Sequence, residues 1–175
     1  IGDTAFGGCS GFDSLKLPKG LKSIEGGAFA DCKGFTGELA IPDSVTTIGK
    51  GAFSDCTGFT GDLVLPDKLT YLEEYAFSDC TSFTGDLIIP GSLTKVGDHA
   101  FENCNGFTGK LVISDGVDEI GVSTFENCNG FKGKLVLADS VTKIGDYAFK
   151  DCSGFTGNLM LPDSMTKIGD SAFKD

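Results

Sequence analysis

The seven cysteines recur at a fixed interval along the chain. They stand at positions 9, 32, 56, 80, 104, 128 and 152, so one interval of 23 residues is followed by five of 24. Each cysteine has a phenylalanine three residues before it and another three residues after it. A period of about 20 to 29 residues is typical of a solenoid, whose coils bury their apolar sides only by stacking on one another. We therefore expect a single solenoid domain over residues 1–175, with units beginning at Cys9, Cys32, Cys56, Cys80, Cys104, Cys128 and Cys152.

The amino-acid composition narrows the range of partners. The formal net charge is -11 at pH 7, and all 14 basic residues are lysine. Because arginine is missing, the chain lacks the planar fork that binds phosphate and guanine, and we predict no nucleic acid partner. No stretch approaches the roughly 18 apolar residues of a membrane span, so no membrane insertion is expected within this segment. The chain begins and ends inside a repeat without the polar caps that solenoids need, and we therefore expect a segment of a longer protein.

One unit, residues 56–79, shows how a coil is expected to fold. Leu63, Val64 and Leu65 favour a short strand, and Pro66 ends it because proline has no N–H for a ladder. Stacked copies of this strand are expected to form a parallel sheet on one face, at about 4.8 Å per coil. The copies are residues 39–41, 87–89, 111–113, 135–137 and 159–161.

A second apolar pair follows the proline in each unit. Leu69 and Leu72 are spaced by three residues, which indicates a bend or another short strand. A glycine then usually follows, as at Gly49 and Gly97, and glycine at a corner indicates either positive φ or a close backbone approach. Glu73 takes this position in the unit above, so positive φ is not required there.

The repeat resembles the BspA-type leucine-rich repeat, a family found in many bacterial and some protist surface proteins. The pattern C-x-G-F-T-G-x-L-x-L-P-D-S-(V/L)-T-x-I-G-x-x-A-F-x-x-C recurs in phase over the whole chain. This resemblance implies a right-handed coil of the leucine-rich-repeat type, with about seven repeats of 23 or 24 residues. The unit of residues 104–127 diverges most, with Ser114 in place of proline, Asp118 in place of threonine and Thr124 in place of alanine.

The cysteines allow several interpretations. Disulfides cannot pair an odd number of thiols completely, and coils in register would hold neighbouring Cβ atoms about 4.8 Å apart, beyond the roughly 3.8 Å of a relaxed bridge. Thiolate metal sites favour CxxC or Cys-His groups, and the chain has a single histidine, His99. We predict a buried ladder of free thiols, each donating a weak hydrogen bond to a carbonyl of the turn. We accordingly expect no cofactor and no metal site.

Catalytic motifs are not evident in the chain. It contains no phosphate-binding loop and no Gly-x-Ser-x-Gly motif, so we predict that it is not an enzyme. Carboxylates recur in a column at Asp31, Asp55, Asp79 and Asp151, which is most simply explained as a solvated turn. Calcium bound between adjacent coils is the alternative interpretation, because calcium prefers oxygen ligands.

The outward side of the predicted sheet is the first candidate binding surface. If Leu63 and Leu65 point inward, Asp62 and Val64 point outward. The residues that occupy the position of Val64 in the other units form a column that is almost entirely aliphatic and includes Ile88 and Val112. The column of Asp62 changes the sign of its charge along the solenoid, reading Glu38, Asp62, Asp86, Lys110, Lys134 and Asn158. β-Branched residues favour sheets in general, but a contiguous exposed apolar strip can also mark a binding surface.

Two positions that vary between units form the second candidate. Tyr71 stands in one of them and Tyr75 in the other, and His99 is the next copy of the Tyr75 position. Because copies stack, Tyr75 and His99 are expected to be neighbours about 5 Å apart. Freely varying positions are most simply exposed to solvent, and exposed tyrosines are frequent at binding interfaces. The candidate ligand-binding residues are therefore Tyr71, Tyr75, His99, Val64, Ile88 and Val112.

These features together predict a binding protein without catalytic activity. The resemblance implies adhesion, with an extracellular or cell-surface location and a protein or glycan ligand on a host or matrix surface. A second hypothesis is a structural spacer, a solenoid rod whose ends associate with one another. No motif in the chain identifies the ligand.

Overall fold

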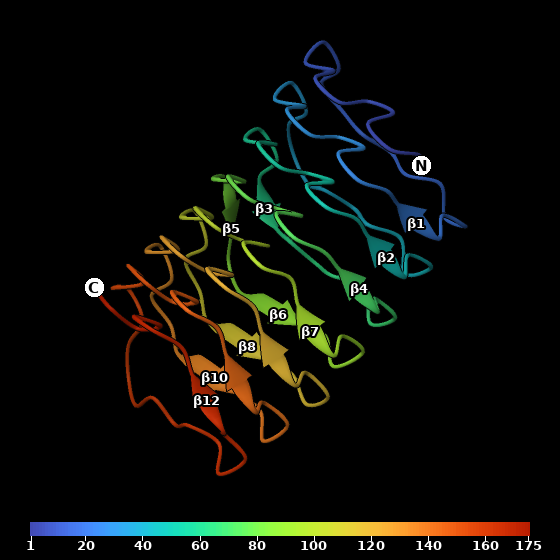
Figure 1. The fold of residues 1–175 in the computed structure, drawn as a ribbon. Coiled ribbons are helices and arrows are strands. Elements are labelled where there is room, and N and C mark those ends of the chain that lie inside the picture. The colour runs from blue at the N-terminus through green and yellow to red at the C-terminus, as the bar shows by residue number, and fades with distance from the viewer.

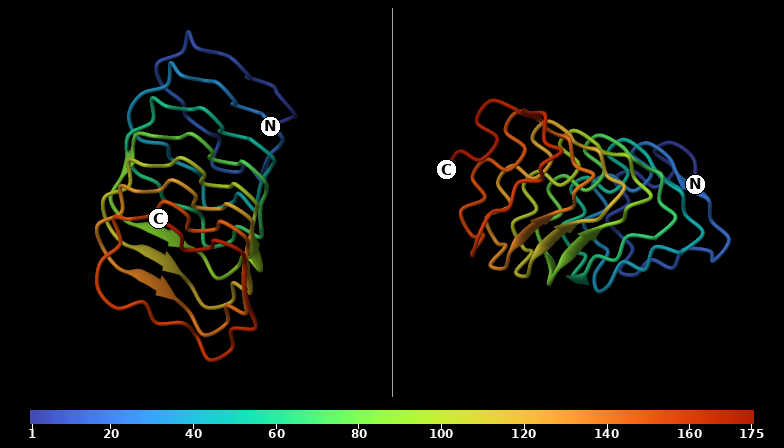
Figure 2. Two further views of the ribbon diagram at one scale, coloured as in Figure 1. Left: turned by 60° about the vertical axis from the view of Figure 1, so that its left-hand side comes forward. Right: turned by 90° about the horizontal axis from the view of Figure 1, so that it is seen from below.

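The computed structural model describes residues 1–175, which form one stack of coils (Figure 1). The N-terminus lies at one end of the stack and the C-terminus at the other (Figure 2). The coils consist of short strands and turns. No helix has the length and apolar character needed to cross a membrane. The solenoid predicted from the cysteine interval is confirmed.

The longest strand ladder is built around the last residue of the second apolar pair of each unit, such as Leu72, where a bend or a short strand was the expectation. The strands are β1 (Ser23–Ile24), β2 (Thr47–Ile48), β4 (Tyr71–Leu72), β7 (Lys95–Val96), β9 (Glu119–Ile120), β11 (Lys143–Ile144) and β12 (Lys167–Ile168). They form two parallel sheets, β1-β2-β4 and β7-β9-β11-β12, and β4 contacts β7 where the two meet. Each residue pairs with its copy one unit away, as Ile48 does with Leu72. The repeat interval therefore sets the register.

A third parallel sheet has the strand order β10-β8-β6. Its strands are β6 (Leu87–Ile89), β8 (Leu111–Ile113) and β10 (Leu135–Leu137), and Figure 2 shows their arrows side by side on one face. The prediction that residues 39–41, 63–65 and 159–161 are also strands of this sheet is wrong. Two further strands, β3 (Gly61–Asp62) and β5 (Phe83–Thr84), pair only with each other.

Proline explains where the β10-β8-β6 sheet stops. Inside the sheet, Ser114 donates its N–H to the Ile89 carbonyl and Ala138 donates its N–H to the Ile113 carbonyl, both at 3.1 Å. All other units have a proline at this position, and proline has no N–H to donate. These prolines are Pro18, Pro42, Pro66, Pro90 and Pro162. The missing strand pairings are those in which the donor would have been a proline.

Replacing Ser114 by proline should open the sheet between β6 and β8. The change removes one backbone hydrogen bond, worth about 1 kcal/mol, and leaves the apolar core in place. We expect the amide of Leu87, which donates to the Lys110 carbonyl at 3.0 Å, to exchange hydrogen roughly fivefold faster. The amide of Gly97 in the other ladder should be unaffected.

Ser114→Ala is the matched control, because alanine keeps the N–H. Unchanged protection of Leu87 in Ser114→Pro would show that proline does not limit this sheet.

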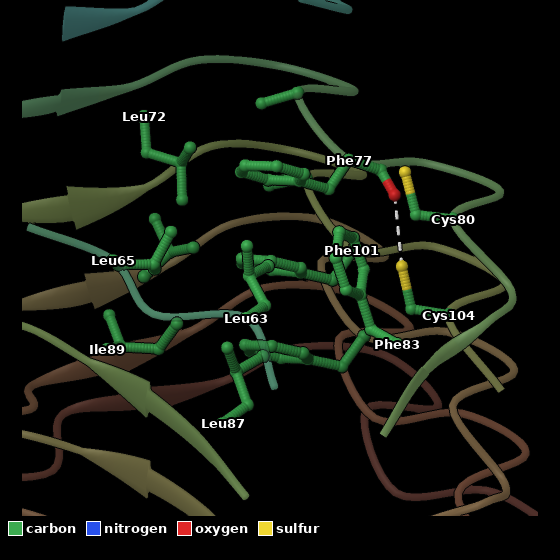
Figure 3. Close-up of a cluster of buried hydrophobic side chains, with 14 of the residues drawn as sticks. Leu63, Leu65, Leu72, Phe77, Cys80, Phe83, Leu87, Ile89, Phe101 and Cys104 are labelled. Carbon is green, nitrogen blue, oxygen red and sulfur yellow. Dashed lines mark hydrogen bonds between the residues drawn. The ribbon is translucent and has the colours of Figure 1, made fainter. Parts of the chain in front are cut away.

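Two columns of stacked phenylalanine rings fill the core. Rings three residues before each cysteine position stack from Phe6 to Phe173, with centroids 5.1 to 5.5 Å apart. Rings three residues after each cysteine form the second column, with spacings of 5.1 to 6.4 Å. Edge-on contacts join the columns, as between Phe77 and Phe83 in Figure 3. Phe101 is fully buried in the first column.

Six of the seven thiols form the predicted hydrogen-bonded ladder. Cys104 donates to the Phe77 carbonyl of the preceding coil at 3.0 Å (Figure 3). The same bond, at 2.9 to 3.0 Å, is made by Cys32, Cys56, Cys80, Cys128 and Cys152. All seven cysteines are free thiols, and Cys9 is half-buried. The thiols therefore join neighbouring coils without covalent bonds.

Burial keeps these thiols protonated. Loss of hydration raises the pKa of Cys56 and of Cys152 to about 12, because the thiolate is disfavoured in the core. The same burial raises the pKa of Cys80, Cys104 and Cys128 well above its ordinary value. A thiol that stays protonated is a poor nucleophile and a poor metal ligand.

The glycine that follows five of the seven strands of the first ladder allows close packing, and Glu25 and Glu73 follow the other two. A Cβ on Gly97 would lie 2.5 Å from the Glu73 carbonyl carbon of the preceding coil. The backbone of Gly97 does not have positive φ. Of the two explanations for this column, close backbone approach is correct.

Candidate functional site

Tyr75 and His99 lie in a column of turns that is hydrogen-bonded along the whole stack. The N–H groups of Tyr75, Phe77 and Asp79 donate to carbonyls of the next coil at 2.8 to 3.0 Å. Tyr75 has a φ of 58° and His99 a φ of 57°, whereas the earlier units have Gly27 and Gly51 at this position. A left-handed backbone costs a residue with a side chain about 1 kcal/mol or more. The hydrogen bonds between coils hold this unfavourable conformation in place.

The rings of Tyr75 and His99 stack face to face, and the expected proximity is confirmed. Their centroids are 4.5 Å apart and their planes differ by 2°. His99 Nδ1 lies 3.0 Å from Glu102 Oε2. Lys50 reaches the Tyr75 ring from the coil on the other side, with Nζ 5.8 Å from the centroid. Both faces of the Tyr75 ring are thus occupied within the protein, and it is not an open platform for a ligand.

The copies of this column differ in exposure. The prediction that variable positions are exposed is wrong for Ser123, which is buried. Ser123 is the copy of this position in the unit between those of His99 and Tyr147. Lys150 lies over Tyr147, with Nζ 5.7 Å from the ring centroid, and pairs with Glu126 at 2.7 Å. The column therefore has two aromatic groups, each with its own lysine.

Tyr71 stands apart from the stacked pair. It lies on β4, its side chain is 64% exposed, and it lines a surface depression of about 420 Å³. Neither Tyr75 nor His99 lines this depression. Its other lining residues are Lys50, Thr70, Leu72, Glu73, Glu74, Thr94, Lys95, Gly97 and Asp98. The structure thus separates the sequence-predicted aromatic patch into an open tyrosine and a closed stack.

The charges around Tyr71 are largely paired with one another. Lys50 Nζ lies 2.7 Å from Glu74 Oε2, and this hydrogen bond raises the pKa of Lys50. Lys95 Nζ lies 3.3 Å from Asp98 Oδ1 and 3.0 Å from Glu119 Oε1. The depression therefore places one open aromatic ring beside several hydrogen-bonding groups. Sequence reasoning did not single out Lys50. Gly51 occupies the position of Tyr75 in the preceding unit, and Lys50 lies one residue before Gly51.

The aliphatic strip on the outward side of the β10-β8-β6 sheet is exposed as predicted. Val64 is 70% exposed and Ile88 is 53% exposed. Val112, in the middle of the strip, is half-buried. Val136 and Met160 continue the strip and are exposed. Of the three sequence-predicted residues of this face, Ile88 and Val112 are paired on β6 and β8, and Val64 lies in the preceding unit outside the strands of that sheet.

The charged column beside this strip changes sign between adjacent coils. Lys110 Nζ lies 3.8 Å from Asp86 Oδ2, and the Lys110 N–H donates to Asp86 Oδ1 at 2.9 Å. Both side chains are about half exposed, at 48% and 49%. Exposed pairs of this kind contribute little to stability, so the column remains available to charges on a partner.

The recurring aspartates of the turn, Asp31, Asp55, Asp79 and Asp151, lie at the surface, and hydrogen bonds connect part of this column. Desolvation and neighbouring carboxylates raise the pKa of Asp55. Further along, Asn103 Nδ2 donates to Asp79 Oδ1 at 3.0 Å, and Asn127 Nδ2 donates to Asn103 Oδ1 at 2.9 Å. No three histidine, cysteine or carboxylate side chains gather in a way that could hold a metal ion. The arrangement offers no support for the calcium alternative.

Comparison with known proteins identifies one family and several solved structures. The family model described as BspA type Leucine rich repeat region matches residues 1–132 and 132–175, in six copies. A crystal structure of a T. pallidum leucine-rich repeat protein is similar with a TM-score of 0.73 and 29% sequence identity, covering 85% of this chain and 67% of that one. None of the curated proteins matches the chain.

Two further crystal structures are more distant. A leucine-rich repeat protein from Bacteroides ovatus has a TM-score of 0.43 and 23% identity, covering 97% of this chain and 66% of that one. A leucine rich cell surface protein from Faecalibacterium prausnitzii has a TM-score of 0.36 and 20% identity, covering 95% of this chain and 62% of that one. This chain therefore spans about two thirds of the length of these proteins, with shares of 67%, 66% and 62%.

Proposed function

The chain belongs to the BspA-type leucine-rich repeat family, and from this we propose that it is a non-catalytic binding module of a cell-surface protein. Its role is adhesion, in which the face of the solenoid recognises a protein or a glycan outside the cell. The general association of the family with bacterial surface proteins supports this location. Solenoids expose long continuous surfaces, which suit them to recognition.

The state of the reactive side chains supports a role without catalysis. Six thiols donate to backbone carbonyls and are held protonated by burial, and the single histidine is stacked on Tyr75 and bonded to Glu102. These groups serve packing between coils. A nucleophile paired with a base in a pocket is the usual sign of a catalytic site, and these side chains do not form one.

The observation that carries the proposal is the exposed ring of Tyr71 in its depression. An open aromatic face offers a large contact area at a small entropic cost, and tyrosine is enriched at binding hot spots. The lysines around it can donate hydrogen bonds and the carboxylates can accept them, which fixes the orientation of a bound group. A sugar ring or a side chain of a partner protein fits this combination.

Binding to arrays of glycans and matrix proteins tests the proposal. For the ligand found, Tyr71→Ser should weaken binding at least tenfold, or about 1.4 kcal/mol, and should leave the melting temperature unchanged because the ring is exposed. Tyr147→Ser is the matched control, since it removes another exposed tyrosine far along the stack. Unchanged affinity in Tyr71→Ser would exclude the depression. A tenfold loss in the double variant Val64→Lys and Ile88→Lys would move the site to the β10-β8-β6 face.

A further inference from the structure

A charged column runs beside the outward face of the β10-β8-β6 sheet and continues onto the coils on either side of it, and its charge changes sign once. Along the solenoid the charged column reads Glu38, Asp62, Asp86, Lys110, Lys134 and Asn158. The change of sign falls between β6 and β8. A second copy turned end for end over this face would therefore place its Lys110 over Asp86 and its Lys134 over Asp62. A surface that complements itself under a two-fold rotation is the requirement for an isologous contact.

The aliphatic strip matches itself under the same rotation. Ile88 of one copy meets Val112 of the second, and Val64 meets Val136. Val64 and Ile88 are 70% and 53% exposed, so both have apolar surface to bury. From Ala40 to Met160 the strip contains no charged residue. Six side chains at about 4.8 Å per coil give a strip about 24 Å long.

We propose that two copies of this chain associate face to face and antiparallel through this strip, with the acidic half of each column opposite the basic half of the other. The strip is narrow, which places the contact in the small, transient class of interfaces. The rotation also brings Asp67 opposite Asp139 and Asp43 opposite Asp163 at the rim, where solvent and salt screen like charges. The contact uses none of the residues of the Tyr71 depression.

Sedimentation velocity of the chain from about 10 µM to about 1 mM at low salt measures this association. The sedimentation coefficient of the unaltered chain should rise with concentration. Asp62→Lys alone and Lys134→Asp alone should each weaken association at least tenfold, because each places like charges opposite one another. An equimolar mixture of the two variants should regain association, since every altered side chain then faces an opposite charge.

The mixing experiment excludes the explanation that the two altered charges compensate each other within a single chain. Asp62 and Lys134 lie three coils, or about 14 Å, apart in a single solenoid, so they cannot restore each other locally. Ile88→Ser tests the apolar strip and should also weaken association at least tenfold, and thermal melting checks that each variant is folded. Tyr71→Ser should associate like the unaltered chain, which separates this contact from the ligand site proposed above.

Three results would overturn the proposal. The first is an unaltered chain that stays monomeric up to about 1 mM at low salt. The second is association that persists in both single charge variants. The third is a mixture that associates no better than either variant alone, which would contradict the antiparallel arrangement.

Discussion

The free energy of unfolding should fall steeply as the pH rises from 9 to 11. An ordinary thiol has a pKa of 9.0, whereas burial raises that of Cys56 and Cys152 to about 12 and that of Cys80, Cys104 and Cys128 well above 9.0. Above pH 9 the unfolded chain releases thiol protons that the folded chain retains. Each further pH unit therefore lowers the free energy of unfolding. At pH 10 the loss is about 1.4 kcal/mol for each of Cys56 and Cys152, or about 3 kcal/mol for the two, and the other three thiols add to it in the same direction. Below pH 9 both states keep the proton, and this loss disappears.

Urea unfolding at pH 8 and at pH 10, with reductant present, measures this effect. Cys104→Ser is the matched variant, because its hydroxyl can donate to the Phe77 carbonyl but does not titrate in this range. The stability of Cys104→Ser should fall less between pH 8 and pH 10 than that of the unaltered chain. Lysines and tyrosines titrate equally in both proteins, so the difference isolates one thiol. An identical pH dependence in the two proteins would show that Cys104 is not protected by burial.

Phe101→Ala should reduce the free energy of unfolding by about 3 to 5 kcal/mol. The ring is fully buried and stacks on Phe77 at 5.5 Å and on Phe125 at 5.4 Å, so its removal leaves a cavity between coils. In a stack of repeats each coil is stabilised by its neighbours only. A defect in a central coil should therefore uncouple the two halves and broaden or split the unfolding transition.

Thermal and urea unfolding followed by circular dichroism provide the measurement. Phe6→Ala is the matched control, since Phe6 occupies the same position in the first coil, is exposed, and stacks only on Phe29. Its loss should be well below that of Phe101→Ala, and its transition should stay single. A loss below about 1 kcal/mol for Phe101→Ala would contradict the stacked-column core.

Much of the fold follows from the interval between cysteines. A residue that recurs at one phase meets its own copy in the next coil, so the phenylalanine columns, the thiol ladder and the Tyr75–His99 neighbours could all be predicted. The extent of the β10-β8-β6 sheet could not, because each pairing depends on one N–H from the next unit. Ser114 and Ala138 were the signal, as the two positions where proline is absent.

The backbone of the turn column was also missed, although the sequence contained a signal. Gly27 and Gly51 occupy the position of Tyr75, and Asp31 recurs as aspartate or asparagine; these residue types tolerate positive φ best. The depression around Tyr71 could not be predicted. The shape of this depression depends on which carboxylate each lysine side chain contacts. Lys50 and Lys95 can adopt several rotamers, and the sequence does not determine which one is populated.

Proline placement makes the stack mechanically uneven. On the face of β6, β8 and β10, strand pairing ties three consecutive coils together, and it stops on both sides because Pro90 and Pro162 have no N–H to donate to the preceding coil. A bending force on the solenoid would open this face first at the flanks and last in the middle. The central coils thus behave as a stiff block between two more compliant arms. Replacing Pro90 or Pro162 by alanine would supply the missing N–H and lengthen that block by one coil.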